Sequence, residues 1–136
     1  MNTIKILVVD DDKSIVKLLV HKFKKYEKDF SVQFAYNGAT ALEIVKADCP
    51  DIAIIDYIMP EMSGAELVKE IRKLGKKMPI IMLTVKSDPR SVLNVAKSVD
   101  DYILKPFDFT DVLARVLKLL LKYKDQRIQE LEQKLK

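Results

Sequence analysis

Hydrophobic positions along the chain change their spacing repeatedly, from short apolar runs to a helical repeat and back again. Short runs rich in Ile and Val predict β-strands at 4–9, 32–34, 52–56, 79–84 and 102–104. Between these runs, apolar residues recur at the spacing of one helix face over 15–23, 41–45, 67–74 and 92–96. A last helix starts near residue 111. The pattern therefore predicts strands and helices in strict alternation.

Polar residues at the predicted helix starts support this reading. Ser63 is followed three residues later by Glu66, which is the spacing of a capping box. Asp88 precedes a proline, the preferred residue at the first helical position. Asp108 or Thr110 caps the last helix. We expect each helix to begin at these positions.

Strands that alternate with helices favour an α/β domain with a parallel sheet and right-handed crossovers. For a chain of 136 residues the flavodoxin-like fold is the natural choice: a (βα)5 doubly wound sheet of strand order 2-1-3-4-5, here with an extended C-terminal helix. Strands 1 and 3 are neighbours in that order. Asp10, Asp11 and Asp56 then lie at the same edge of the sheet.

Composition and charge exclude several classes of protein. The single Cys49 excludes an internal disulfide framework and fits a reducing compartment. No run reaches the roughly 18 to 20 apolar residues of a membrane span, and no signal-peptide pattern precedes the first strand, so we expect a cytoplasmic protein. The net charge is +4, but residues 117–136 hold six Lys/Arg against three Asp/Glu, so we expect no direct binding of nucleic acid.

Three carboxylates held together repel one another. Two unit charges about 4 Å apart cost roughly 4 kcal/mol at an effective dielectric near 20. Either some of Asp10, Asp11 and Asp56 are protonated, or a cation joins them. Oxygen ligands that are few and open to solvent favour Mg²⁺ over Ca²⁺, and zinc is disfavoured because Cys49 and His21 stand alone.

Two further strand ends carry groups that complete a reactive site. Thr84 brings a hydroxyl from the fourth strand, and Lys105 brings a cation from the fifth. Taken one at a time, these residues each have an ordinary interpretation: Thr84 as a strand residue, Lys105 as a surface lysine and Asp56 as a turn aspartate. Together they are the parts of phosphoryl transfer, in which positioning and charge stabilisation supply most of the catalysis.

The motifs at these strand ends resemble those of a known family. They are residues 7–12, Asp56-Tyr57-Ile58-Met59-Pro60 with Gly64, Leu83-Thr84, and residues 101–107. This set resembles the receiver domain of two-component response regulators. The resemblance covers a domain over about 3–122 and leaves 123–136 as an extension of the last helix.

The resemblance implies a role for each site residue. Asp56 is similar to the phosphoacceptor, which takes a phosphoryl group from a sensor histidine kinase, a phosphotransfer protein or a small acyl phosphate. Asp11 is similar to the direct Mg²⁺ ligand, with Asp10 acting partly through water and the carbonyl of Ile58 as a further ligand. Lys105 would pair with a phosphoryl oxygen.

The resemblance also implies a switch rather than a turnover enzyme, although the domain would catalyse its own phosphorylation and dephosphorylation. Thr84 would turn its hydroxyl onto the phosphoryl group, and Tyr102 would follow into the space. The face formed by the fourth helix, fifth strand and fifth helix would then change shape for a partner or a homodimer. Asp12 is expected only to cap a helix.

Two places depart from the family pattern: Val85, and Ser98-Val99 before the fifth strand, where Gly-Ala is usual. Val85 stands where a small residue is usual, and it would narrow access to Asp56. Ile58 and Lys86 flank the route of attacking water, and their effect on the lifetime of the phosphoryl group has no predicted sign.

The last helix carries a second pattern. Its apolar positions are spaced 4-3-4-3-4, with one lysine among them: Leu117, Leu121, Lys124, Ile128, Leu131 and Leu135. We expect a parallel coiled coil that forms a homodimer or leads into an output domain in a longer protein. A frayed amphipathic extension is the alternative.

Two other functional classes are weighed against a phosphorylatable receiver. A Mg²⁺-dependent phosphohydrolase would need a second acid or base beside Asp56, and Tyr57 and Ile58 supply none. A phosphorylation-independent interaction or dimerisation module on the same fold would be expected to have lost a site residue. Asp11, Asp56, Thr84 and Lys105 are all present.

Overall fold

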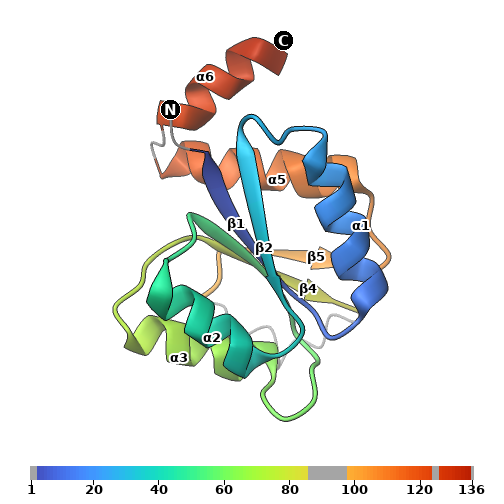
Figure 1. Cartoon of the computed structure of the whole chain (residues 1–136), viewed down its shortest axis with the longest axis vertical. Helices are drawn as coiled ribbons and strands as arrows, with labels where there is room; N and C mark the ends of the chain where they lie inside the picture. Colours follow the sequence, from blue (N-terminus) through green and yellow to red (C-terminus); the bar gives the residue numbers. More distant parts are fainter. Residues whose placement is uncertain (1–2, 86–97, 124–125, 136) are drawn as a thin grey trace.

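A parallel β-sheet forms the centre of the protein (Figure 1). The structure is a computed structural model that describes residues 3–85, 98–123 and 126–135. For residues 126–128 it describes the backbone alone. Its strands lie in the order β2-β1-β3-β4-β5 and all pair in parallel, as predicted. Their bounds are β1 Ile4–Val9, β2 Phe30–Ala35, β3 Ile52–Asp56, β4 Ile80–Thr84 and β5 Asp101–Leu104.

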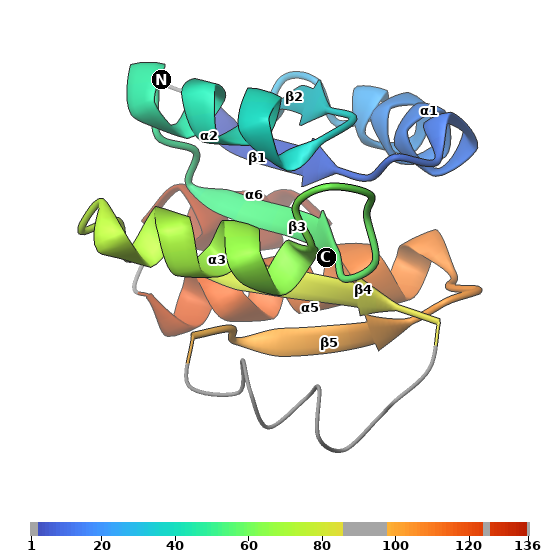
Figure 2. The ribbon, with the colours of Figure 1, turned by 90° about the horizontal axis from the view of Figure 1, so that it is seen from below.

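Helices cover both faces of the sheet (Figure 2). Helices α1 (Lys13–Lys24) and α5 (Phe109–Lys122) pack on one face, where Phe23 makes edge-on contacts with Phe30 and Phe109. Helices α2 (Gly38–Ala47) and α3 (Gly64–Lys73) pack on the other face. Two apolar layers therefore enclose the sheet, and the flavodoxin-like fold is confirmed.

Burial along the strands follows their place in the sheet. Every residue of β3 and β4 is buried, as expected of central strands with helices on both faces. The edge strands β2 and β5 have exposed or half-buried positions. The apolar runs were thus the strongest signal for the interior of the fold.

Side-chain caps begin the helices where the sequence places polar residues. Ser63 accepts a hydrogen bond from the Glu66 amide at 3.2 Å, which confirms the capping box. Asp108, rather than Thr110, caps α5. The predicted cap at Asp88, with the helix over 92–96, lies outside the described residues.

The expectation of one uninterrupted C-terminal helix is wrong. Helix α5 ends at Lys122 with Tyr123 as its C-cap, and a separate helix α6 spans Gln126–Leu135. Helix α6 lies beside the end of the sheet at which β1 begins (Figure 1). Its Leu131 is buried in the core on the α1 and α5 side. The division of the chain at residues 122 and 123 stays a prediction. Among the described residues, no helix has the length and apolar character needed to cross a membrane.

Candidate functional site at the carboxyl edge of the sheet

The predicted site residues lie at the carboxyl ends of neighbouring strands. Asp10 directly follows β1, Asp56 ends β3, Thr84 ends β4 and Lys105 directly follows β5. The strand register aligns these ends, because Asp56 is paired with Leu83, the residue before Thr84. Parallel pairing therefore brings together residues that are up to 95 positions apart in the sequence.

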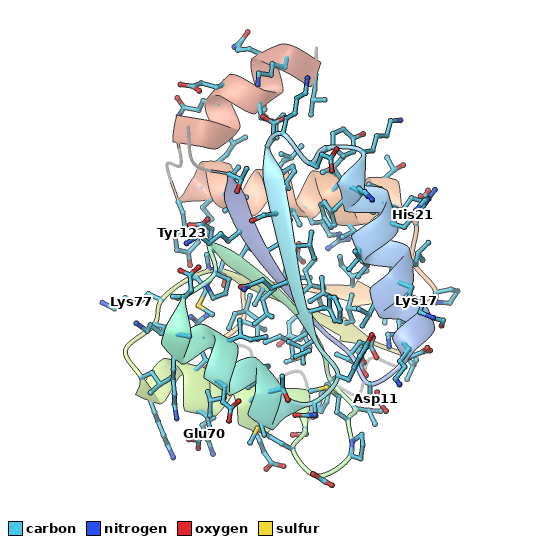
Figure 3. All side chains as sticks on the ribbon, in the orientation of Figure 1. Asp11, Lys17, His21, Glu70, Lys77 and Tyr123 are labelled. Atoms are coloured by element: carbon cyan, nitrogen blue, oxygen red, sulfur yellow. The ribbon has the colours of Figure 1, made fainter. Side chains whose placement is uncertain are left out.

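Three carboxylates converge at this edge. One oxygen from each of Asp10, Asp11 and Asp56 lies within 4.8 Å of the others. Asp10 is fully buried and Asp56 is 5% exposed, whereas Asp11 is open to solvent at the rim (Figure 3). The structure thus confirms that the carboxylates of strands 1 and 3 meet, and it shows that two of them are removed from water.

Lys105 lies between the two buried carboxylates. Its Nζ is 2.9 Å from Asp10 Oδ2 and 3.1 Å from Asp56 Oδ1. Its backbone amide donates to the Thr84 carbonyl at 2.7 Å, which fixes the chain that carries the ammonium. The other oxygen of Asp10 accepts from the Asp12 amide at 2.9 Å. Lys105 therefore neutralises part of the charge that the carboxylates concentrate.

Burial and charge change the acidity of these groups. Burial, and secondly the charge of Asp10, raise the pKa of Asp56 to about 6, although Lys105 opposes the shift. Burial disfavours the charged form of Lys105, but its contacts with Asp10 and Asp56 outweigh that effect and raise the pKa of Lys105. The environment of the site therefore disfavours the charged form of Asp56 and favours the charged form of Lys105.

Asp12, the third residue of the acidic triplet, has a different role. Its side chain caps α1 by accepting hydrogen bonds from the Ser14 amide at 2.9 Å and the Ser14 hydroxyl at 2.6 Å. The hydrogen bonds from Ser14 lower the pKa of Asp12. The expectation that Asp12 caps a helix is confirmed.

The loop after β3 packs closely behind the site. Gly64 begins α3, and its amide donates to the Tyr57 carbonyl at 2.8 Å. A Cβ atom at residue 64 would collide with the carbonyl oxygen of Asp56. Glycine is therefore required for α3 to approach the strand that carries Asp56.

Apolar side chains border the same edge. Ile58 and Val85, the residues that follow shortly after Asp56 and Thr84, are 65% and 60% exposed. Tyr102 is half-buried and packs against the core on the α2 and α3 side. Thr84 is buried, with 4% of its surface exposed. Lys86, which the sequence places beside the route of attacking water, lies outside the described residues.

The donor set fits a hard divalent cation. Asp10, Asp11 and Asp56 offer carboxylate oxygens only, and the Lys105 ammonium already occupies a position between two of them. His21 points outward from α1 (Figure 3). Cys49 contacts Met78 and packs against the core on the α2 and α3 side. Neither joins the carboxylates, so the expected preference for Mg²⁺ over zinc agrees with the residues present.

Arg115 is a polar residue near the site's edge strand that sequence reasoning missed. Its guanidinium bonds Asp101 at 2.8 Å, the Tyr102 carbonyl at 3.0 Å and Asp111 at 3.1 Å. The spacing of Asp111 and Arg115, four residues apart on a helix, was the available signal. Arg115 thereby fixes β5 to α5.

The protein is thus an α/β protein with a doubly wound parallel sheet, and its buried carboxylates and a lysine lie at the carboxyl edge of that sheet. Comparison with known protein families then identifies its family. The chain belongs to the response regulator receiver domain family, whose model matches residues 6–117.

Solved structures agree with this placement. The chain is similar to the chemotaxis protein CheY4 of Vibrio cholerae, with 30% identity, a TM-score of 0.81 and coverage of 88% of this chain and 100% of that one. A two-component response regulator from Clostridium difficile shares 30% identity at a TM-score of 0.82, with 89% and 98% covered. TrrA of Thermotoga maritima, solved in complex with Mg²⁺-BeF, shares 38% identity at 0.77, with 87% and 100% covered.

Proposed function

We propose that this receiver domain accepts a phosphoryl group on Asp56 in a Mg²⁺-dependent reaction. The donor is the phosphohistidine of a sensor histidine kinase or of a phosphotransfer protein in the cytoplasm. One observation carries the proposal: a buried carboxylate at a strand end lies 3.1 Å from a lysine and within 4.8 Å of two further carboxylates. The Mg²⁺ complex of TrrA supports the choice of metal.

The residues of the chain divide the chemistry among themselves. An Asp56 oxygen attacks phosphorus, the phosphorus–nitrogen bond breaks, and its electron pair returns to the imidazole of the donor. Asp10, Asp11, Asp56 and the Ile58 carbonyl would hold Mg²⁺, which supplies positive charge to the phosphoryl oxygens. The Lys105 ammonium exchanges its contact with Asp56 for a contact with a phosphoryl oxygen.

The phosphoryl group changes the balance of charge at the edge. It adds about −1.5 to −2 charges and three acceptor oxygens, which Lys105 and the Thr84 hydroxyl bind. Movement of Thr84 gives Tyr102 space to turn inward, and the surface that β5 and α5 form with the fourth helix changes shape. That helix lies outside the described residues. This surface serves homodimerisation or an output partner, and loss of dimerisation in Thr84→Ala is the expected sign of the coupling.

Receiver domains are signalling modules rather than turnover enzymes. We therefore assign the slow loss of the phosphoryl group to the same site, with water as the second acceptor. Of the net charge of +4, +3 belongs to residues 117–136, which hold six Lys/Arg and three Asp/Glu, and no nucleic-acid role enters the proposal.

Intact mass spectrometry after incubation with acetyl phosphate and Mg²⁺ tests the proposal. We expect one added phosphoryl group in the wild-type protein, none in Asp56→Asn and none with EDTA. Asp48→Asn is the matched control, because Asp48 is an exposed carboxylate whose partner is Lys5.

Absence of the mass gain has two readings that a second variant separates. Val85→Ala opens the approach to Asp56, so a gain in that variant alone means that Val85 excludes small donors. If neither protein gains mass from acetyl phosphate or from a phosphorylated histidine donor, the domain acts without phosphorylation and the proposal is wrong.

A further inference from the structure

The C-terminal helix α6 is held against the body of its own chain. Leu131 is 2% exposed and belongs to the core on the α1 and α5 side. Lys134 Nζ pairs with Asp29 Oδ1 at 3.2 Å, across 105 residues of sequence. Figure 1 shows α6 beside the amino-terminal end of β1, at the edge opposite the carboxylates.

A polar network fixes the turn that allows this docking. Tyr123 caps α5, and its hydroxyl donates to Asp100 Oδ1 at 2.9 Å. The other oxygen of Asp100 accepts from the Ile80 amide and lies 3.7 Å from Arg72 Nη2. The turn is therefore tied to the start of β4 and to the end of α3.

The break between α5 and α6 is not enforced by the sequence. No glycine or proline occurs from residue 109 to the end of the chain. The backbone of Tyr123, at φ −85° and ψ 11°, is close to the helical region. The same residues could therefore form one continuous helix over 109–135, about 40 Å long.

In a continuous helix the apolar positions would form one stripe. Leu117, Leu121, Leu131 and Leu135 all belong to the 4-3-4-3-4 seam. Leu131 cannot be buried in the core of its own domain and in a seam at the same time. Docking of α6 and pairing of the seam therefore exclude each other.

We propose that α6 is a dimerisation helix kept in a docked position, and that a second copy of this chain is its alternative partner. A released helix of ten residues is too short to be stable alone, so it needs an apolar partner. The seam is complementary to itself in a parallel pair. Arg127 and Glu132 stand at flanking positions five residues apart, where opposite charges attract between two parallel copies. This inference does not rest on phosphorylation.

Variants that weaken docking without touching the seam provide the test. Asp29→Lys removes the ion pair from the body side, and Tyr123→Phe removes the hydrogen bond that holds the turn. The matched control is Glu27→Lys, a charge reversal at an exposed residue two positions from Asp29, the residue that pairs with Lys134 of α6. Hydrogen exchange of 129–135 reports docking, and sedimentation equilibrium of the full chain reports pairing.

The combined Asp29→Lys/Tyr123→Phe variant should exchange faster over 129–135 and dimerise with a dissociation constant lower by about fivefold or more, with the control unchanged. Glu132→Lys added to that background should reverse the gain in dimer, because it places like charges across the pair. Restoring the ion pair with Lys134→Asp in Asp29→Lys should restore docking.

Two results would overturn the inference. In the first, α6 is released, as exchange shows, yet the chain stays monomeric at several hundred micromolar. In the second, the combined variant leaves both exchange and mass unchanged, which would mean that these contacts do not control the position of α6.

Discussion

The two edges of the sheet use charged side chains in opposite ways. At the carboxyl edge, three carboxylates lie together and Lys105 pairs with two of them, and the three polar side chains buried in the described part of the chain, Asp10, Asp56 and Thr84, all lie there. At the opposite edge, where the strands begin and which is called the amino edge below, the opposite charges of Arg72 and Asp100 lie 3.7 Å apart. In Figure 3, the label of Asp11 locates the carboxyl edge of the sheet and the label of Tyr123 locates the amino edge.

The hydrogen bonds show what the difference means. Arg72 donates to the carbonyls of Ser98, Lys76 and Met78 at 2.7–3.1 Å, so its donors are used to join two loops. Asp56, by contrast, has a raised pKa because its negative charge is buried beside another. The contacts at the amino edge therefore stabilise the fold, whereas the carboxyl edge keeps an unbalanced negative charge.

The largest effect is expected from Arg72→Met, which keeps the apolar stem of the side chain and removes its donors. The carbonyls of Ser98 and Met78 would lose their partners, and Asp100 would lose a nearby cation. We expect a loss of about 2–4 kcal/mol in the free energy of unfolding, measured by urea denaturation.

Lys73→Met is the control for that prediction. Lys73 is the next residue on α3, and its exposed pair with Glu70 at 3.3 Å should contribute less than about 0.5 kcal/mol. Equal losses in the two variants would contradict the view that the buried donors of the amino edge carry the stability.

The carboxyl edge should respond with the opposite sign. Asp56→Asn removes the buried charge and should raise the free energy of unfolding by about 1–3 kcal/mol at pH 7 without Mg²⁺. The pKa of Asp56 is about 6 in the folded protein against an ordinary 3.8, so the folded state binds more protons between these values. The contribution of Asp56 to stability therefore falls as pH rises from about 4 to about 6.

Urea denaturation across that pH range checks the sign. The advantage of Asp56→Asn should be absent near pH 4 and complete above pH 6. Asp48→Asn, at an exposed carboxylate, should show no such growth. An Asp56→Asn protein that is less stable than wild type at pH 7 would mean that the contact with Lys105 outweighs the burial of the charge.

The elements of the fold were readable because burial leaves a periodic signal. The runs at β3 and β4 are apolar up to their last residues, Asp56 and Thr84, and β1 is apolar except for Lys5 and is followed by Asp10. Parallel pairing then determines which ends are neighbours. The convergence of the carboxylates was therefore predictable from sequence and strand order.

Contacts between distant loops left no comparable signal. Arg72 reads as one more basic residue in the last turn of α3, and its contacts with Ser98 and Asp100 depend on tertiary packing. The end of α5 at Tyr123 was missed for a related reason. Without glycine or proline at this point, the contacts that accompany the break are the Tyr123 hydroxyl with Asp100, the burial of Leu131 and the pair of Lys134 with Asp29, and all are long-range.

Mg²⁺ should reduce the imbalance at the carboxyl edge. At a concentration about ten times its dissociation constant, the ion should raise the free energy of unfolding of the wild-type protein by about 1.4 kcal/mol. Asp11→Asn should lose most of that increment. Asp12→Asn is the matched control: asparagine also caps helices, so this variant loses the charge but keeps the cap, and it should keep the full response to Mg²⁺.

Denaturation with Mg²⁺ and with EDTA measures both increments. A response of Asp11→Asn equal to that of wild type would exclude Asp11 from the cation site. A loss of the response in Asp12→Asn would mean that the whole acidic triplet, rather than its first two residues, contributes to the site.

The smallest effect should come from Tyr123→Phe at the amino edge, because the hydroxyl that it removes is partly exposed. Burial, and secondly the hydrogen bond to Asp100, raise the pKa of Tyr123, which agrees with a neutral hydroxyl that donates to a carboxylate. We expect a loss of about 0.5–1 kcal/mol. Tyr26→Phe, at a half-buried tyrosine of the same chain, should be neutral. If the loss comes from the hydrogen bond to Asp100, which also binds the Ile80 amide, Tyr123→Phe should cause no further loss in an Asp100→Ala background. A loss of stability that persists in that background would be assigned to packing of the ring instead.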